Sequence, residues 1–223
     1  MRKIVKRFVA LFLVPLTRWY LRKERKYTYK GITVSVMPGV FHPGFFYSTK
    51  FVIDFLSDQP LRNKTLLELG CGTGLISVVT AKSGAIVTAS DLSQIAIENV
   101  MRNATSNRVA MEIIASDLFE KIDKRAFDWI IINPPYYARN PSNEEDLAWY
   151  CGENFEYFQK LFTQLGTHMH SGTQTIMVLT KGSDVEKIKS LAEKHDFEFV
   201  LIKEKSVFFD EKDFLFRIEY KVS

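Results

Sequence analysis

The chain has 223 residues, 46% of them hydrophobic, and a formal net charge of +4 at pH 7. This length and composition are sufficient to bury one large hydrophobic core. Two cysteines, Cys71 and Cys151, are too few for a disulfide framework, and neither they nor the four histidines have the spacing of metal ligands. We therefore expect no metal and, because a chain without disulfides suits a reducing compartment, a cytoplasmic protein.

The positive charge is confined to the N-terminal end of the chain. Residues 1–30 carry ten basic side chains against one acidic side chain, a net charge of +9, so residues 31–223 carry −5. Apolar side chains recur every four residues near the start, at Ile4, Phe8, Phe12, Leu16 and Tyr20. Most basic side chains fall opposite them. The pattern predicts a basic amphipathic helix, kinked near Pro15, in an extension (residues 1–30) that precedes a single domain (residues 31–223).

Three roles are open for this basic helix. Its apolar stripe can pack on the domain, its basic face can contact an anionic partner such as RNA or a ribosome-bound factor, or the helix can lie on a membrane surface. The apolar run over residues 8–16 is too short to span a bilayer, so we expect no transmembrane segment. Residues 17–20 offer no small-residue cleavage site, which argues against export.

From residue 29 onward, short apolar runs alternate with segments of helical periodicity. We expect a strand or hairpin at residues 29–36, and strands over residues 65–69, 85–90, 111–115, 127–132, 173–180, 197–203 and 214–222. We expect helices over residues 49–57, 75–83, 94–103, 153–170 and 185–195. Apolar strands between helices predict an α/β domain whose largely parallel sheet is covered on both faces. Ligands of such sheets bind at the carboxyl ends of the strands.

A glycine-rich turn follows the expected strand at residues 65–69. Its residues are Glu68, Leu69, Gly70, Cys71, Gly72, Thr73 and Gly74, and glycines in such a turn let a ligand approach the backbone closely. A dinucleotide-binding turn would have a further glycine where this chain has Leu75. Asp91 ends the next expected strand, where a carboxylate suits the two hydroxyl groups of a ribose. Asp91 can alternatively cap the following helix, a role for which Ser93 competes.

A second motif, the tetrapeptide Asn133, Pro134, Pro135 and Tyr136, follows the apolar run that ends at residue 132. Proline keeps the residue before it out of the helical region, so the chain leaves the strand extended. The Asn133 amide and the Pro134 carbonyl are then free to accept hydrogen bonds from a planar NH2 group, on which Tyr136 can stack. Such bonds favour the attacking geometry of a delocalised nitrogen and predict methyl transfer to it. The alternative is an ordinary turn at a strand end.

With both motifs, the chain resembles the class I S-adenosylmethionine (SAM) methyltransferases that carry an NPPY motif. Within that class it is similar to the release-factor glutamine methyltransferases, the HemK/PrmC family, in a short form without a separate N-terminal helical domain. The resemblance covers roughly residues 40–180. It implies a Rossmann-like sheet of seven mostly parallel strands with an antiparallel last strand, helices on both faces, and SAM as the cofactor.

The resemblance also implies roles for individual residues. It places Glu68, Gly70, Cys71, Gly72, Thr73 and Gly74 around the methionine end of SAM, Asp91 followed by Leu92 at the ribose, and Asp117 with Leu118 at the adenine. Asn133, Pro134, Pro135 and Tyr136 would bind the acceptor nitrogen, with Asn133, Pro134 and Tyr136 as the catalytic residues. Asn133 would also belong to the cofactor-binding residues.

Departures from the family pattern concern the substrate. Residues 42–49 carry aromatic side chains where the glutamine methyltransferases have acidic ones, and residues 152–157 match only loosely. The polar stretch at residues 138–147 would either overhang the acceptor pocket or form a solvated acidic loop. We expect methylation of a glutamine side chain in a protein such as a translation release factor. The exocyclic amine of adenine in RNA or DNA is an alternative acceptor, and a non-catalytic SAM-binding module is an alternative of another class.

Overall fold

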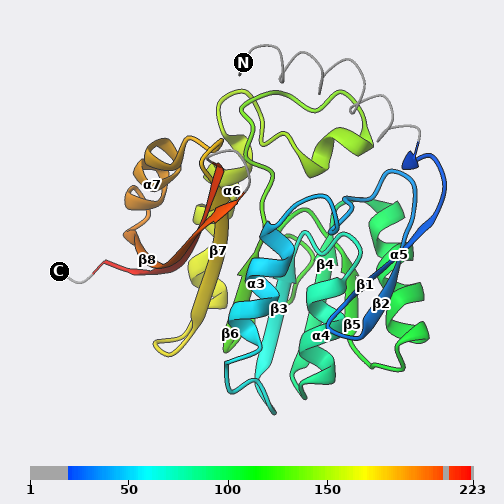
Figure 1. The fold of residues 1–223 in the computed structure, drawn as a ribbon. Coiled ribbons are helices and arrows are strands. Elements are labelled where there is room, and N and C mark those ends of the chain that lie inside the picture. Colours follow the sequence, from blue (N-terminus) through cyan, green and yellow to red (C-terminus); the bar gives the residue numbers. More distant parts are fainter. Residues whose placement is uncertain (1–19, 208–210, 222–223) are drawn as a thin grey trace.

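Seven strands form one sheet that is covered by helices on both faces, in a computed structural model that describes residues 20–207 and 211–221 (Figure 1). The strands are β1 (Arg25–Tyr29), β2 (Ile32–Val36), β3 (Thr65–Leu69), β4 (Ile86–Asp91), β5 (Glu112–Ala115), β6 (Trp129–Ile132), β7 (Gln174–Thr180), β8 (Phe197–Val207) and β9 (Glu211–Tyr220). The helices are α3 (Ser48–Leu56), α4 (Leu75–Lys82), α5 (Gln94–Ser106), α6 (Glu156–Leu165) and α7 (Val185–Glu193), with short 3-10 helices η2 (Glu144–Ala148) and η3 (Gly166–His168).

The strands of the large sheet follow the order β5-β4-β3-β6-β7-β9-β8. The strands from β5 to β7 run parallel, whereas β9 inserts antiparallel between β7 and β8. This arrangement confirms the predicted α/β class, the mostly parallel seven-stranded sheet and its antiparallel last strand. Strands β1 and β2 form a separate antiparallel hairpin, and the expected division after residue 30 falls in its turn.

Both faces of the sheet are buried against helices. Leu67 and Ile130 pack on one face with the apolar sides of α6 and α7. Their neighbours Leu66 and Ile131 point to the other face and pack with α3 and α4, as the two-residue repeat of a strand requires. Strands buried on both faces are apolar throughout, which is why these segments form continuous hydrophobic runs in the sequence.

Two buried asparagines of α5 fix the chain that leads from β2 toward the carboxyl edge of the sheet. Asn103 Oδ1 accepts from the Ser35 N–H at 2.7 Å, and its Nδ2 donates to the carbonyls of Ser35 and Thr73 at 2.8 and 2.9 Å. Asn99 Oδ1 accepts from the Met37 N–H at 3.0 Å, and its Nδ2 donates to the Ser35 carbonyl at 2.8 Å. Buried amides need such partners. They therefore tie the hairpin to α5 and to the turn after β3.

The helix expected over residues 153–170 is shorter in the structure. Gly152 has a φ of +88° and Phe155 a φ of +62°, so the backbone is left-handed just before the helix, and α6 begins only at Glu156. After Leu165 the chain tightens into η3. The amphipathic pattern is correct, but periodicity alone does not reveal where a left-handed residue interrupts a helix.

The N-terminal extension is described only from residue 20 onward. The expected amphipathic helix and its kink near Pro15 fall in residues 1–19 and lie outside the described residues. At the start of the described part, the Arg25 guanidinium lies 3.9 Å from the centroid of the Tyr20 ring, and its Nε donates to the Tyr20 carbonyl at 2.9 Å. In residues 20–207 and 211–221, no helix combines the length and the apolar character needed to cross a membrane.

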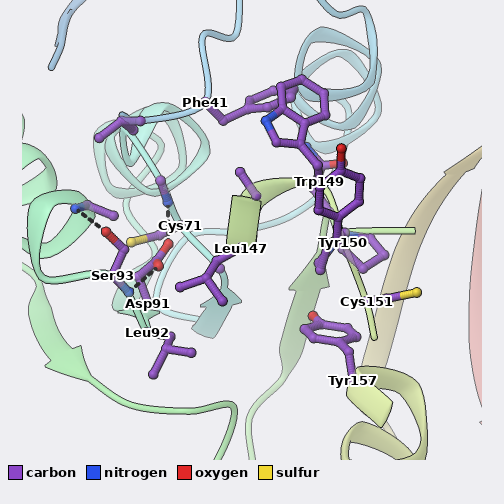
Figure 2. A pocket seen from close by; sticks show the side chains of 18 of the residues that line it. Phe41, Cys71, Asp91, Leu92, Ser93, Leu147, Trp149, Tyr150, Cys151 and Tyr157 are labelled. Carbon is purple, nitrogen blue, oxygen red and sulfur yellow. Dashed lines mark hydrogen bonds between the residues drawn. The ribbon is translucent and has the colours of Figure 1, made fainter. Parts of the chain in front are cut away.

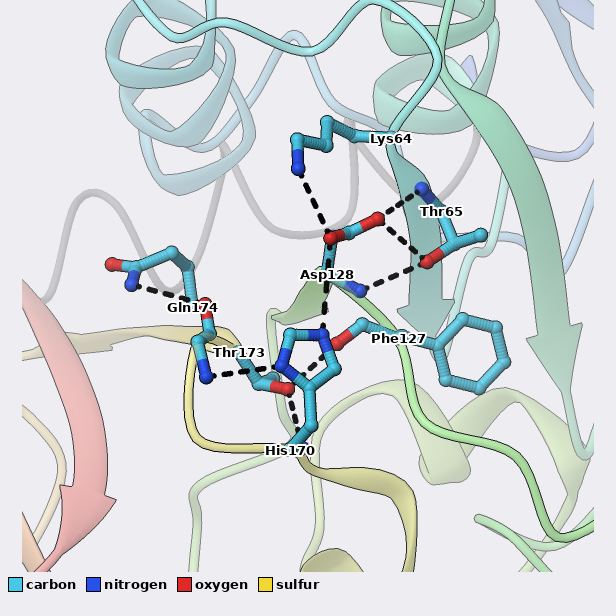
Figure 3. Close-up of polar contacts among 8 residues, drawn as sticks. Lys64, Thr65, Phe127, Asp128, His170, Thr173 and Gln174 are labelled. Carbon is cyan, nitrogen blue, oxygen red and sulfur yellow. Dashed lines mark hydrogen bonds and ion pairs between the residues drawn. The ribbon is translucent and has the colours of Figure 1, made fainter.

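The amino edge of the sheet is held by a network around Asp128, just before β6 (Figure 3). Asp128 Oδ2 accepts from the N–H and the hydroxyl of Thr65 at 2.9 and 3.0 Å, and Oδ1 accepts from Lys64 Nζ at 3.2 Å. His170 Nε2 lies 3.8 Å from the same Oδ1. The Thr65 N–H, more than any other contact, holds the pKa of the Asp128 carboxyl below its ordinary value. The starts of β3 and β6 are thereby joined.

We expect Asp128→Ala to lower the free energy of unfolding by about 1 to 3 kcal/mol, because hydrogen bonds to a charged group are lost. In the wild type, the contribution of this carboxylate is present above the ordinary Asp pKa of about 3.9 and is lost as the pH falls through its lower folded value. Urea unfolding from neutral pH down to about pH 3 measures both effects. Equal acid sensitivity in wild type and variant would contradict the role of Asp128.

Candidate active site

A cavity of about 470 Å³ lies at the carboxyl ends of β3, β4, β5 and β6. It brings together all but one of the residues that the sequence analysis singled out. The residues that line it are Glu68, Gly70, Cys71, Gly72, Thr73, Asp91, Leu92, Asp117, Leu118, Asn133, Pro134, Pro135 and Tyr136. Gly74 is the exception and packs against Val100 of α5. Motifs far apart in the chain meet here because parallel strands end at the same edge.

The glycines of the turn after β3 meet two different constraints. Gly70, Gly72 and Gly74 have φ angles of +68°, +51° and +70°, a region that residues with a Cβ adopt only under strain. A Cβ added to Gly74 would lie 2.3 Å from Val100 Cγ2, so this glycine lets the turn approach α5 closely. A Cβ added to Gly70 would meet no atom within 4 Å. Gly74 therefore serves packing, and Gly70 keeps a space open on the cavity wall.

Asp91 joins the ends of β3 and β4. Its Oδ2 accepts from the Gly72 N–H at 2.8 Å, and its Oδ1 accepts from the Ser93 N–H at 2.9 Å. Burial raises the pKa of Asp91, and these N–H groups oppose that effect. The cap of α5 is Ser93, whose hydroxyl oxygen accepts from the Ala96 N–H at 3.3 Å. The capping role considered for Asp91 is thus filled by Ser93, and the carboxylate of Asp91 remains at the cavity wall.

Glu68 is buried at the end of β3 and still reaches the cavity wall. Its Oε2 accepts from the Ser77 N–H at 2.8 Å and from the Ser77 hydroxyl. Burial raises the pKa of Glu68 to about 8; the negative charge of Asp91 adds to this rise, and the two Ser77 bonds oppose it. A positively charged group placed beside Glu68 would favour its ionised form.

The two cysteines, Cys71 and Cys151, are both free and buried on the cavity wall. Burial raises the pKa of the Cys71 thiol, and it raises the pKa of the Cys151 thiol to about 11. Both side chains are therefore neutral near pH 7 and act as apolar lining.

The NPPY tetrapeptide leaves β6 beside the turn after β3, because β3 and β6 are paired neighbours. Within the described residues, the side-chain amide of Asn133 and the carbonyl of Pro134 make no hydrogen bond. Both residues line the cavity. Tyr136 forms a hydrogen bond with Thr180 at the end of β7, and burial raises its pKa. The tetrapeptide is thus fixed at its tyrosine, while two acceptors remain available to a ligand.

Asp117 lies beyond β5 and is contacted by a lysine of α6. Lys160 Nζ donates to Asp117 Oδ2, and it lies 2.6 Å from Glu120 Oε1. Burial lowers the pKa of Lys160, but the hydrogen bonds and charges of the two carboxylates outweigh it and leave that pKa raised. The adjoining Leu118 has a left-handed backbone, with a φ of +53°. Asp117 and Lys160 both line the cavity.

Residues 138–150, which we call the lid, supply part of the cavity lining, including Leu147, Trp149 and Tyr150 (Figure 2). The 3-10 helix η2 lies in this segment, and Leu147 and Trp149 point to the cavity from it. Glu144 Oε1 accepts from the Ser93 hydroxyl at 2.7 Å, which anchors the lid next to Asp91. At its other end, the Tyr137 N–H donates to the Trp149 carbonyl at 3.0 Å. The polar stretch is therefore a folded cover that reaches the Asp91 side of the cavity as well as the acceptor side.

An aromatic cluster joins the lid to the segment before α3. The ring centroids of Phe41 and Phe46 are 4.9 Å apart, and Trp149 lies 5.2 Å from the first and 4.9 Å from the second. Phe41 and Trp149 line the cavity, while Phe46 is 37% exposed and the adjacent Phe45 is 45% exposed. The aromatic segment at residues 42–49 therefore offers uncovered rings beside the cavity.

Several cavity residues carry no sequence signal strong enough to have been found. Tyr157 and Lys160 come from one face of α6, and Figure 2 shows the Tyr157 ring directed toward the cavity. Burial raises the pKa of the Tyr157 hydroxyl, which is therefore neutral. Because Tyr157 and Lys160 are three residues apart, the sequence predicts that they share one face of a helix. It does not predict that this face lines the cavity.

The family model of the methyltransferase small domain matches residues 31–198, more than half of the chain. A candidate protein N5-glutamine methyltransferase from Methanocaldococcus jannaschii is 36% identical over 118 residues, which is 52% of this chain and 56% of the relative. Ribosomal RNA small subunit methyltransferase C from Haemophilus influenzae is 33% identical over 112 residues, which is 49% of this chain and 33% of the relative. The chain thus spans between about a third and about half of the length of these relatives.

Among solved structures, the 16S rRNA N2 methyltransferase (RsmC) of T. thermophilus, in complex with AdoMet and guanosine, has a TM-score of 0.62 at 18% identity. The match covers 87% of this chain and 50% of that chain, and it shows a shared fold. The chain belongs to the methyltransferase small domain family. This membership confirms the prediction of a SAM-dependent class I methyltransferase, whereas the finer resemblance to the glutamine methyltransferases stays a prediction.

We expect Gly74→Ala to affect mainly stability and Gly70→Ala to affect mainly ligand binding. Gly74→Ala should lower the free energy of unfolding by about 2 to 5 kcal/mol, because backbone strain adds to the overlap with Val100. Gly70→Ala should cost only the strain, about 1 to 2 kcal/mol, but should weaken binding of S-adenosylhomocysteine (SAH), since its methyl group enters the cavity. Urea unfolding and calorimetric titration separate the two. A larger loss of stability in Gly70→Ala, or a larger loss of SAH affinity in Gly74→Ala, would contradict the roles given to these two glycines.

We expect SAH binding near neutral pH to release a proton from Glu68. The ammonium group of SAH, placed beside Glu68, would favour a carboxylate whose pKa in the free protein is about 8. The affinity for SAH should therefore rise with pH and level off above the pKa of Glu68 in the free protein. Calorimetry in buffers of different ionisation enthalpy counts the proton. Glu68→Gln should release none, and unchanged proton release in that variant would refute the proposal.

Proposed function

We propose that this chain is a SAM-dependent N-methyltransferase that acts on a planar NH2 group. The observation that carries the proposal is a pair of acceptors, the Asn133 amide and the Pro134 carbonyl, that no residue in the described part of the chain engages, on the wall of a cavity that also holds the glycine-rich turn. Two acceptors at one strand end match the two in-plane donors of an amide or an aromatic amine. A non-catalytic SAM-binding module would have no need of them.

The cavity residues supply positioning and hydrogen bonding. SAM, when bound, contributes a methyl group on a sulfonium that carries its own leaving group. Asn133 and Pro134 accept from the acceptor nitrogen and turn its lone pair out of conjugation, in a geometry favourable for attack. These bonds strengthen as the nitrogen becomes positive, so they stabilise the transition state more than the ground state. The nitrogen loses its proton after the methyl transfer, so no side chain of the cavity has to act as a general base.

A protein glutamine, such as one in a translation release factor, is the acceptor that we propose first. The archaeal relative named for N5-glutamine methylation supports it, at 36% identity over 118 residues. The lid adds weak support, because Glu144, Glu145 and Asp146 give it an acidic surface that suits a basic protein. Under this proposal, residues 31–223 form the catalytic domain of a cytoplasmic enzyme, and the basic residues 1–30 contact an anionic partner such as RNA or a ribosome-bound factor.

The exocyclic amine of a nucleic acid base is the second candidate. Relatives named for ribosomal RNA methylation support it, and so do the exposed rings beside the cavity. Phe45, Phe46 and Tyr137 are 45%, 37% and 43% exposed, and such rings can stack on unpaired bases. Adenine, whose amine has the same two donors as a glutamine amide, is the base that the NPPY motif predicts.

We expect Asn133→Ala to lose about 2 to 4 kcal/mol of transition-state stabilisation, by analogy with the removal of one oxyanion-hole donor. Binding of SAH should change by less than about threefold, because the loss falls on the acceptor side. Transfer of a radiolabelled methyl group from SAM measures the first effect, and calorimetry measures the second. The matched control is Asn107→Ala, whose amide bonds the Thr33 carbonyl away from the cavity and should leave transfer unchanged.

The same labelling assay distinguishes the acceptors when it is run on extract from cells that lack the enzyme. Label that is sensitive to protease and lies on a band of release-factor size supports glutamine. Label that only nuclease removes supports the base. Full activity of Asn133→Ala on either acceptor would refute the role of the NPPY tetrapeptide.

A further inference from the structure

The strand order places the candidate site residues in a row along the carboxyl edge of the sheet. The strands run β6, β3, β4, β5, so Asn133, Gly70, Asp91 and Asp117 follow one another at their ends. Neighbouring strands lie about 4.8 Å apart, which puts the first and last of these ends roughly 14 Å from each other. A cofactor that reacts at Asn133 and lies along this row therefore has its far end at Asp117.

Asp117 presents one oxygen to its lysine, and its other oxygen has no partner among residues 20–207 and 211–221. Lys160 Nζ donates to Oδ2, and Oδ1 accepts no hydrogen bond from any of the described residues. The side chain of Asp117 is 42% exposed and that of Lys160 is 29% exposed, so the pair faces the cavity rather than the core. Lys160 is itself held by Glu120 at 2.6 Å, which limits where its ammonium can move.

We propose that Lys160 is a positioning residue for the adenine of the cofactor. It holds the Asp117 carboxylate by Oδ2, so that Oδ1 faces the base and accepts from the exocyclic amine. Adenine offers a donor at that position, whereas hypoxanthine has a carbonyl oxygen there, which a carboxylate repels. The Asp117 and Lys160 pair therefore selects adenine over its deaminated form. This inference rests on the cofactor placement of the proposed function and is independent of the methyl acceptor.

The test compares two ligands that differ only in the base, SAH and S-inosylhomocysteine, by calorimetric titration of the full chain. The wild type should prefer SAH by about tenfold or more, the size of one charge-assisted hydrogen bond. In Lys160→Met, SAH affinity should fall about 5- to 20-fold, while affinity for S-inosylhomocysteine should change less than about twofold. The preference for adenine should thus largely disappear. Lys160→Arg, which keeps a donor to Asp117, should retain it.

Two control variants separate this role from a general loss of stability. Lys189→Met breaks a similar pair with Glu186 on α7, away from the cavity, and should leave both affinities unchanged. Glu120→Gln removes the second carboxylate on Lys160 and keeps the bond to Asp117, so the preference for adenine should persist. Far-ultraviolet circular dichroism and urea unfolding of each variant confirm that it is folded.

Three outcomes would overturn the inference. An equal loss of affinity for both ligands in Lys160→Met would show that the lysine supports the cavity but does not distinguish adenine from hypoxanthine. Unchanged SAH affinity in that variant would show that Asp117 needs no positioning. A wild type that binds both ligands equally would show that nothing at Asp117 reads the base. A wild type that binds neither would instead refute the cofactor placement itself, and so would be recognised as a failure of the proposed function.

Discussion

The arrangement of the cavity depends on one hydrogen bond, from the Gly72 N–H to Asp91 Oδ2 at 2.8 Å. It joins the turn after β3 to the end of β4, and the second oxygen of the same carboxylate accepts from the N–H of Ser93, the residue just before α5. Ser93 in turn caps that helix and donates to Glu144 of the lid. A single half-buried carboxylate thus links a turn, a helix and a loop. Because carboxylates removed from water are costly without such partners, the geometry tolerates few alternatives.

Contacts at the amino edge of the sheet and on α5 hold the carboxyl edge, where the cavity lies, in place. At the amino edge, Asp128 and Thr65 bond reciprocally, which fixes the relative positions of β3 and β6 and therefore of the motifs that follow them. On α5, Asn103 bonds both the Ser35 carbonyl and the Thr73 carbonyl, so the hairpin and the glycine-rich turn share one anchor. The cavity is consequently built on elements that are tied to one another at both edges of the sheet.

The parts of the fold that the sequence predicted are those whose signals are local. The apolar run of β3 and the glycine-rich turn from Gly70 to Gly74 specify a strand and a turn without reference to the rest of the chain, and both were placed correctly. The start of α6 was not predicted correctly, because Phe155 has a left-handed backbone that interrupts the helix, and aromatic residues rarely adopt that conformation. Lys160 was missed for another reason: its partner, Asp117, lies 43 residues earlier in the chain, and only the tertiary structure brings the two together.

The lid connects the two halves of the cavity in a way that neither motif shows on its own. One of its anchors, the bond from Ser93 to Glu144, lies beside Asp91, and the other, from the Tyr137 N–H to the Trp149 carbonyl, lies next to the NPPY tetrapeptide. Leu147 and Trp149 point into the cavity between these anchors. A ligand that fills the cavity would therefore meet the same segment at the Asp91 end and at the Asn133 end. The shape of the space beside Asn133 thus depends on a segment whose position is fixed beside Asp91.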